Sequence, residues 1–170
     1  MSDKVTHRPA LRPYLASDAT GLAAIFRASI EELTQDDYDE AQRAAWISCA
    51  DDEASFSERL QTSLTLVATL DGDPVGFICL NGAELIDMLY VHPEFARQGI
   101  ASLLCDAIER LAAARGAKLL MTDASDTAKP FFERRGFTAE HRNTIEIDGE
   151  WLGNTRMKKK LSAAEQKRAS

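Results

Sequence analysis

Residues 89–101 combine residue types that suit anion binding at the start of a helix. The apolar run that opens this segment ends at Pro93, because proline has no N–H group to donate to a strand ladder. Gly99 and Ala101 are small where the chain must bend closely into a helix, and Arg97 adds a positive charge. The first turn of a helix leaves backbone N–H groups free and carries the positive end of the helix dipole. Such a turn suits a phosphate or pyrophosphate group, although in many α/β proteins the same pattern only reverses the chain.

The periodicity of apolar residues predicts the elements that hold this segment in place. Before it, we expect a strand at 10–15, a helix at 17–33 capped by Ser17, and two more helices at 37–50 and 54–62. From residue 64 the pattern changes to short apolar runs separated by turn residues. These runs predict strands at 64–70, 74–80, 84–91, 118–124, 138–147 and 150–161, with helices at 102–115 and 128–135. The order indicates an α+β (mixed α/β) fold with a sheet of about seven strands.

The length and composition favour one globular domain in a reducing compartment. Of the 170 residues, 45% are apolar and 28% are charged, and no apolar run is long enough for a membrane-spanning helix. The net charge of −7 argues against nucleic acid or an anionic membrane as the main partner. The three cysteines form no CxxC pair, so we expect no metal site and a cytoplasmic location. We expect one domain at 10–161, between a flexible N-terminus at 1–9 and a flexible tail at 162–170.

Two motifs carry a similarity to a known family. The first runs along the anion-binding segment and consists of Val91, Pro93, Phe95, Gly99 and Ala101. The second is residues 128–137, with the sequence Ala-Lys-Pro-Phe-Phe-Glu-Arg-Arg-Gly-Phe. Together they resemble the acyl-CoA-binding motif and the last-helix motif of the GCN5-related N-acetyltransferases (the GNAT superfamily), in the same order and at the same spacing. The resemblance covers residues 10–161 and points to the small single-domain bacterial branch.

The resemblance implies a fold and a co-substrate. The fold would be a GNAT-like acyl-CoA N-acyltransferase fold, a mostly antiparallel seven-stranded sheet flanked by helices and splayed between the strands ending near Val91 and Ala124. Acetyl-CoA would lie in the splay, with its pantetheine arm paired to one strand like an added strand. The residues implied are Met88, Leu89, Tyr90 and Val91 for that arm, Arg97, Gln98, Gly99, Ile100, Ala101 and Ser102 for the pyrophosphate, and Ser125, Phe131 and Phe132 for the thiol end.

Two positions depart from the family pattern. Ala96 stands where the family has a glutamine or arginine, so one polar contact is missing unless Arg97 beside it compensates. Phe132 stands where many members have the tyrosine that protonates the departing thiolate. Because a thiol has a pKa of about 8.5, its thiolate leaves without strict need of an acid. The general acid is therefore left unassigned.

Transfer to an amine also calls for a base. At pH 7, deprotonating an amine with a pKa of about 10.4 costs about 4.6 kcal/mol. Leu85 occupies the position of the family's strand glutamate, so we predict that Asp87, two residues on and on the same strand face, acts through water. Glu84, on the opposite face, is the weaker candidate, and His92 is a third because of its ordinary pKa. In the alternative interpretation, Asp87 only orients its neighbours, Glu84 faces solvent and His92 is part of the turn.

The acceptor pocket of the family would fall in residues 31–60, which hold ten acidic residues and two basic ones. Negative charge there would concentrate a cationic amine. The competing interpretation is that these acids form the solvated faces of surface helices. Ser29, Tyr38 and Trp46 are the residues predicted to line the pocket, although the two aromatic residues also suit helix packing.

The sequence therefore predicts an enzyme, an acetyl-CoA-dependent N-acetyltransferase in which an amine attacks the thioester directly in a ternary complex. The expected acceptor is a small-molecule or peptide amine, a cationic one among the candidates. A homodimer is one expected assembly, since family members often pair edge strands between subunits. The alternative from another class is a non-catalytic acyl-CoA-binding sensor or partner module, which Ala96 and Phe132 favour. A domain that uses the glycine turn for a different phosphate ligand is a third interpretation.

Overall fold

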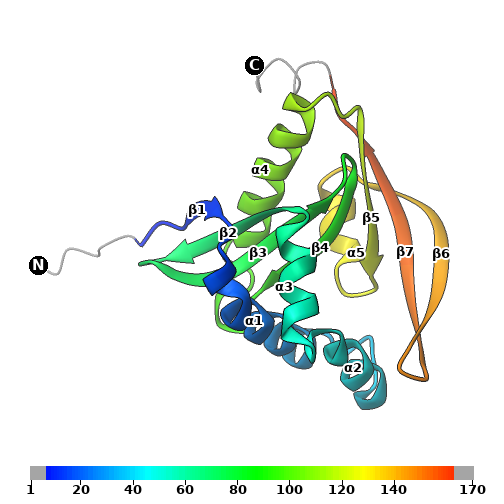
Figure 1. Cartoon of the computed structure of the whole chain (residues 1–170). Coiled ribbons are helices and arrows are strands. Elements are labelled where there is room, and N and C mark those ends of the chain that lie inside the picture. The colour runs from blue at the N-terminus through cyan, green and yellow to red at the C-terminus, as the bar shows by residue number, and fades with distance from the viewer. Residues whose placement is uncertain (1–6, 163–170) are drawn as a thin grey trace, which may run out of the picture.

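The computed structural model describes residues 7–162, which form one sheet with helices on both faces (Figure 1). The strands are β1 (Ala10–Pro13), β2 (Leu64–Leu70), β3 (Asp73–Asn81), β4 (Leu85–Val91), β5 (Leu119–Ser125), β6 (Thr138–Ile147) and β7 (Glu150–Lys160). The helices are α1 (Ala19–Leu33), α2 (Glu40–Ile47), α3 (Glu53–Gln61), α4 (Ile100–Ala114) and α5 (Lys129–Arg134). Most of the two ends predicted to be flexible, namely residues 1–6 and 163–170, lies outside the described residues.

The sheet divides into two parts at the junction of β4 and β5. The strand order is β1-β2-β3-β4-β5-β7-β6, and every neighbouring pair is antiparallel except β4 and β5. These two parallel strands share only two residue pairs, Leu85 with Met121 and Ile86 with Thr122. Beyond them the strands diverge, and the Thr122 hydroxyl donates a hydrogen bond to the Ile86 carbonyl at the point of divergence. The predicted seven-stranded, mostly antiparallel sheet and its splay are confirmed.

Two separate cores cover the two faces of the sheet. Beneath α4 and α5, a buried cluster includes Ile78, Leu80, Ile86, Leu104, Ile108, Leu120, Phe132 and Met157. Beneath α1 and α3, a second cluster includes Leu22, Phe26, Ile30, Phe56, Leu60, Val67 and Phe77. Both helical layers are amphipathic, so each buries its apolar stripe against the sheet and leaves its charged side outward. Within residues 7–162, no helix is long and apolar enough to cross a membrane.

A β-bulge in β4 gives Asp87 its orientation. Met88 pairs with Cys79 of β3, but the next pair joins Ile86 to Leu80, so Asp87 is the extra residue. In a regular strand, Asp87 and Met88 would point to opposite faces. Here both lie on the side of α1 and α3, because Asp87 contacts Arg59 of α3 and Met88 belongs to the core beneath α1. The regular alternation of side chains between the two faces of the sheet, which was used to predict where each residue of this strand points, is therefore interrupted at Asp87.

The starts of two helices differ from the prediction, for reasons of capping. Ser17 does not cap the first helix, because residues 16–18 form a 3₁₀ turn in which the Asp18 carboxylate accepts the N–H of Leu15. Arg12 donates two hydrogen bonds of 2.7 Å to the same carboxylate and lowers its pKa. Asp39 caps α2 and exchanges reciprocal hydrogen bonds with Gln42, so that helix begins three residues later than predicted.

Gly76 of β3 lets the N-terminus of α4 lie close to the sheet. A Cβ atom at this position would lie 3.1 Å from the Tyr90 carbonyl oxygen and 3.2 Å from Ile100 Cγ2. We therefore expect Gly76→Val to lower the free energy of unfolding by about 1–3 kcal/mol, the usual cost of overpacking, as measured by chemical denaturation. Gly21→Val in α1 is the control, because an added Cβ there meets nothing within 4 Å. Equal destabilisation by the two changes would contradict the close packing.

Candidate active site

A groove of about 620 Å³ opens where β4 and β5 diverge. Its walls come from both strands, the turn before α4, the first turn of α4, and α5. Of the thirteen residues predicted to bind the cofactor, twelve line this groove: Met88, Leu89, Tyr90, Val91, Arg97, Gly99, Ile100, Ala101, Ser102, Ser125, Phe131 and Phe132. Gln98 is the exception, since its exposed side-chain amide donates to the Glu94 carbonyl instead.

One wall of the groove is a strand edge that the sheet does not use. Residues 88–91 of β4 pair with β3 on one side. On the other side, pairing with β5 stops at Ile86. The N–H and C=O groups along this edge are therefore available to an extended ligand, which could add to the sheet as a further strand would.

The opposite end of the groove is formed by the start of α4. Gly99 caps the helix with a left-handed backbone (φ 83°), and Arg97 before it is also left-handed (φ 61°). The N–H of Leu103 donates to the Gly99 carbonyl, so the first intrahelical bond begins only there. Within residues 7–162, the three preceding N–H groups, those of residues 100–102, have no hydrogen-bond acceptor. Free donors, the helix dipole and Arg97 together make this end of the groove suited to an anion.

The groove has a second cationic residue that no sequence motif marks. Arg134, in the last turn of α5, lines the groove as Arg97 does. Ala96 also lines it, but its methyl group supplies no polar contact, as the sequence indicated. Only the tertiary fold brings α5 to the mouth of the splay, so Arg134 could be read from the sequence merely as a charge at a helix end.

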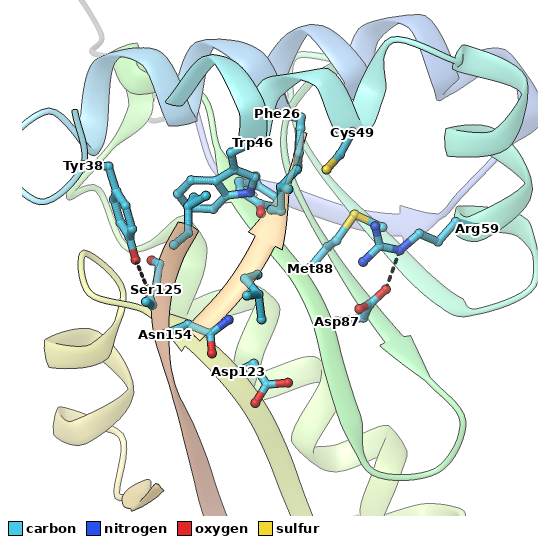
Figure 2. Close-up of a pocket in the computed structure, with 15 residues that line it drawn as sticks. Phe26, Tyr38, Trp46, Cys49, Arg59, Asp87, Met88, Asp123, Ser125 and Asn154 are labelled. Carbon is cyan, nitrogen blue, oxygen red and sulfur yellow. Dashed lines mark hydrogen bonds and ion pairs between the residues drawn. The ribbon is translucent and has the colours of Figure 1, made fainter. Parts of the chain in front are cut away.

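A smaller cavity of about 240 Å³ adjoins the groove on the side of α1–α3 (Figure 2). Tyr38 and Trp46, two of the residues predicted to line an acceptor pocket, line this cavity. Ser29, the third, lies in the groove instead and is only 7% exposed. Apolar side chains of the β6–β7 hairpin close the other side, among them Ile145, Ile147 and Leu152. We call this cavity the acceptor pocket from here on, after the role that the sequence predicts for Tyr38 and Trp46.

Two carboxylates stand at the mouth of the splay, one on each strand. Asp87 and Asp123 each follow the last β4–β5 pair by one residue, and both line the groove and the acceptor pocket. Asp87 Oδ2 accepts a 2.7 Å hydrogen bond from Arg59 Nε, and this bond raises the pKa of Arg59. Asp123 is held by Arg156, which donates from Nε at 2.6 Å and from Nη2 at 2.9 Å. Each carboxylate at the site therefore has a guanidinium partner.

The acidic residues of segment 31–60 do not shape either cavity. All ten are exposed, and none lines the groove or the acceptor pocket. The charged residue that this segment does contribute to the pocket is Arg59, a cation. The interpretation as solvated helix faces is therefore the correct one for these acids, because their helices turn the apolar side toward the sheet.

The other candidate bases lie outside the two cavities. Glu84 lines neither cavity, and its backbone carbonyl accepts the N–H of Met121 beside the splay. His92 is part of the turn after β4, where its Nδ1 accepts the N–H of Glu94. Of the three candidates, only Asp87 reaches the point where groove and acceptor pocket meet.

Phe132 and the cysteines offer little acid–base chemistry. Phe132 lines the groove but is only 2% exposed and packs edge-on against Phe131 and Phe137. Burial raises the pKa of Cys105 to about 12 and also raises that of Cys79. Cys49 lies at the wall of the acceptor pocket, and burial raises its pKa too. Within residues 7–162, no three histidine, cysteine or acidic residues gather as metal ligands.

Tyr38 joins three segments around the acceptor pocket. Its hydroxyl donates to the Gly153 carbonyl of β7 at 2.7 Å and accepts the N–H of Asp126 at 2.9 Å (Figure 2 shows the first of these bonds). Desolvation raises the pKa of Tyr38, so the hydroxyl keeps its proton and can donate. The neighbouring Gln42 side chain donates to the Trp151 carbonyl, which adds a second link between α2 and β7.

We expect Tyr38→Phe to weaken binding of the acceptor more than it lowers the stability of the fold. Loss of the hydroxyl leaves the partly buried Asp126 N–H and Gly153 carbonyl without this partner, which costs at most about 1–3 kcal/mol of unfolding free energy. The KM for the acceptor should rise severalfold, while the affinity for the groove ligand stays within about twofold of wild type. Tyr14→Phe is the matched control, since its hydroxyl bonds Ser57 outside both cavities. An acceptor KM raised equally in both variants would contradict the bracing role.

Comparison with known proteins gives the family. The acetyltransferase (GNAT) domain family matches residues 34–161. The protein named uncharacterized N-acetyltransferase YafP, from Escherichia coli strain K12, is 37% identical over 150 residues, which cover 88% of this chain and 95% of that protein. The peptidyl-lysine N-acetyltransferase YjaB of Salmonella typhimurium strain LT2 is 31% identical over 126 residues, 74% of this chain and 80% of that protein.

A solved structure agrees with these matches. The crystal structure of a GCN5-related N-acetyltransferase from Rhodopseudomonas palustris superposes with a TM-score of 0.90 at 57% identity. The alignment covers 94% of this chain and all of that one. The chain therefore belongs to the GCN5-related N-acetyltransferase superfamily and is an acyltransferase of that family.

Proposed function

We propose that the protein is an acetyl-CoA-dependent N-acetyltransferase in which an amine attacks the thioester directly within a ternary complex. One observation carries this proposal: the groove and the acceptor pocket meet where β4 and β5 part. Six residues line both cavities, namely Trp46, Asp87, Met88, Tyr90, Asp123 and Ser125. Two substrates bound from opposite sides would bring their reacting atoms together at this junction.

The groove fits acetyl-CoA at both of its recognisable parts. The unpaired edge of residues 88–91 suits the amide-bearing pantetheine arm. The free N–H groups at the start of α4, with Arg97 beside them, suit the pyrophosphate. Arg134, at the same groove, provides charge for a further phosphate. Bound there, acetyl-CoA supplies an acetyl group activated as a thioester.

Asp87 is the proposed base for the acceptor amine, with Glu84 as the weaker candidate. Asp87 lies at the junction of the two cavities, whereas Glu84 lines neither. An amine that arrives protonated loses a proton through water to the carboxylate, which passes it on to solvent. Reaching the neutral amine at pH 7 costs about 4.6 kcal/mol in total. Oδ1 of Asp87 has no hydrogen bond within residues 7–162, so it is the oxygen open to that water.

The transfer balances without a side-chain acid at Phe132. The amine nitrogen forms a bond to the acetyl carbon, the carbon–sulfur bond breaks, and its electron pair leaves on sulfur. The second N–H proton, which the nitrogen loses on attack, passes through water to solvent, and the sulfur takes its proton from solvent. Phe132 keeps the thiol end apolar, and a thiolate with a pKa of about 8.5 departs without a general acid.

Initial-rate kinetics with an amine panel tests direct attack. We expect lines that intersect in double-reciprocal plots, and coenzyme A released only when an amine is present. Parallel lines, or a burst of thiol without acceptor, would contradict the proposal and would point to a covalent intermediate, for which Cys49 at the pocket wall would be examined first.

We propose a cytoplasmic protein, and the three free cysteines fit a reducing compartment. A homodimer through the sheet edge stays a prediction. In the described chain, β6 is an edge strand, and its outer side is not paired.

A further inference from the structure

The guanidinium of Arg59 presents an unused hydrogen-bonding edge to the acceptor pocket. Arg59 lies near the C-terminus of α3 and donates to Asp87 from Nε alone. A guanidinium carries five N–H donors, and the four on Nη1 and Nη2 have no acceptor within residues 7–162. In Figure 2 these two nitrogens lie on the side of the group toward Met88 and the pocket. Because the side chain is 46% exposed, a ligand can reach them.

The charges at this edge cancel within two ion pairs, Arg59 with Asp87 and Arg156 with Asp123, so it is the free Nη donors that favour an anionic group on the acceptor. Asp123 is neutralised by Arg156 and also accepts a hydrogen bond from Asn143. The acids of residues 31–60 are exposed and face away from the pocket. The two Nη groups are therefore the charged donors at the pocket that still lack a partner among the described residues. A planar fork of this kind matches a carboxylate through two parallel hydrogen bonds.

Asp87 and Arg59 together form a two-part recognition unit. The Nε bond fixes the guanidinium beside the carboxylate at 2.7 Å, so the open Nη edge and the open Asp87 Oδ1 are neighbours. An ammonium and a carboxylate on the same carbon atom, as in an α-amino acid, have the matching charges at matching proximity. The ammonium would face Asp87, where its proton is removed, and the carboxylate would face Arg59.

The remaining walls define what else the acceptor carries. Trp46, Ile145, Ile147 and Leu152 surround the pocket with apolar surface. The volume of about 240 Å³ is below the roughly 300–1,000 Å³ of pockets for drug-sized ligands, so a small molecule fits better than a large one. An apolar side chain of an amino acid is the size and chemistry these walls accept.

On the basis of the proposed N-acetyltransferase activity, we propose that the acceptor is a small α-amino acid with an apolar side chain. Arg59 selects its carboxylate.

The test compares acceptors that differ only at the carboxyl group. The probes are L-phenylalanine and L-methionine, their carboxamides, and a peptide whose single amine is a lysine side chain. For the wild type, we expect kcat/KM to be at least about tenfold higher for a free amino acid than for its amide, by coenzyme A release. Arg59→Met should bring this ratio to about one. Arg59→Lys, which keeps the charge and loses the fork, should give an intermediate ratio.

The controls separate this inference from the underlying activity. Arg27→Met removes an arginine of α1 that lines neither cavity, and it should leave the ratio at its wild-type value. Acetyl-CoA affinity, measured by calorimetry, reports that each variant is folded, because Arg59 does not line the groove. If acetyl-CoA binds but the amides or the lysine peptide react as well as the amino acids, the inferred substrate class is wrong. An unchanged ratio in Arg59→Met also overturns it. Failure of acetyl-CoA to bind at all overturns the proposed function itself.

Discussion

The double variant Arg97→Glu with Gly99→Pro is expected to bind acetyl-CoA at least about 100-fold more weakly than the wild type while the sheet stays folded. Gly99 has a φ of 83°, which proline, fixed near −65°, cannot adopt. Proline at position 99 also removes one N–H group at the start of α4 and changes the direction of the neighbouring N–H groups. Arg97→Glu places a negative charge where the pyrophosphate would lie. Charge-assisted hydrogen bonds contribute about 1.5–3 kcal/mol each, so losing two of them exceeds a 100-fold effect.

Calorimetric titration measures this loss, with circular dichroism and thermal unfolding as checks on the fold. Arg110→Glu is the matched control, because it reverses the same charge on an exposed position of the same helix, away from the groove. The core beneath α4, which includes Leu104 and Ile108, is untouched by either variant. Wild-type affinity in a folded double variant would remove the turn before α4 from the binding site.

Asp87→Asn is expected to lower kcat at least about 100-fold at pH 7, within the usual contribution of a general base. Asparagine can still accept the hydrogen bond from Arg59 Nε, so the local geometry survives while the proton acceptor is lost. The loss should shrink as the pH approaches the pKa of the acceptor amine, because free amine then exists without help. A pH profile of kcat with saturating acetyl-CoA measures this trend.

Glu84→Gln serves as the control for Asp87→Asn. Glu84 lies in the same chain segment but lines neither cavity, so the kcat of the Glu84→Gln variant should stay within about twofold of wild type. A purely structural role for Asp87 would give a loss that does not change with pH. Equal losses in the two variants would likewise exclude Asp87 as the specific base.

The sequence predicted most of the sheet and the groove because their signals are local. Apolar runs and turn residues marked the strands, and Gly99 and Ala101 marked the start of α4 within two residues. The cofactor residues followed from the resemblance of two short motifs to those of the family, and of these residues only Gln98 does not line the groove. Structural features that are encoded within a window of eight to ten residues could therefore be predicted from the sequence.

The acceptor side was harder to predict because its geometry comes from contacts between distant segments. The bulge at Asp87 depends on how β4 pairs with β3, and nothing in the local pattern marks it. Arg59 is 28 residues from Asp87 and becomes its partner only when α3 packs on the sheet. Ser29 was expected at the acceptor pocket, but α1 turns it toward the groove. The excess of acids in residues 31–60 was a compositional signal, and composition does not show whether the side chains point toward the pocket or toward solvent.

The most direct test of the central claim is a calorimetric titration of the purified protein with acetyl-CoA, with ATP and NADH as controls. We expect a one-to-one complex with acetyl-CoA, and binding of both control nucleotides at least about tenfold weaker, because only the CoA ester has a pantetheine arm that can pair with the open edge of β4. Absence of acetyl-CoA binding, or equal binding of all three ligands, would contradict the claim that the groove between β4 and β5 holds this co-substrate.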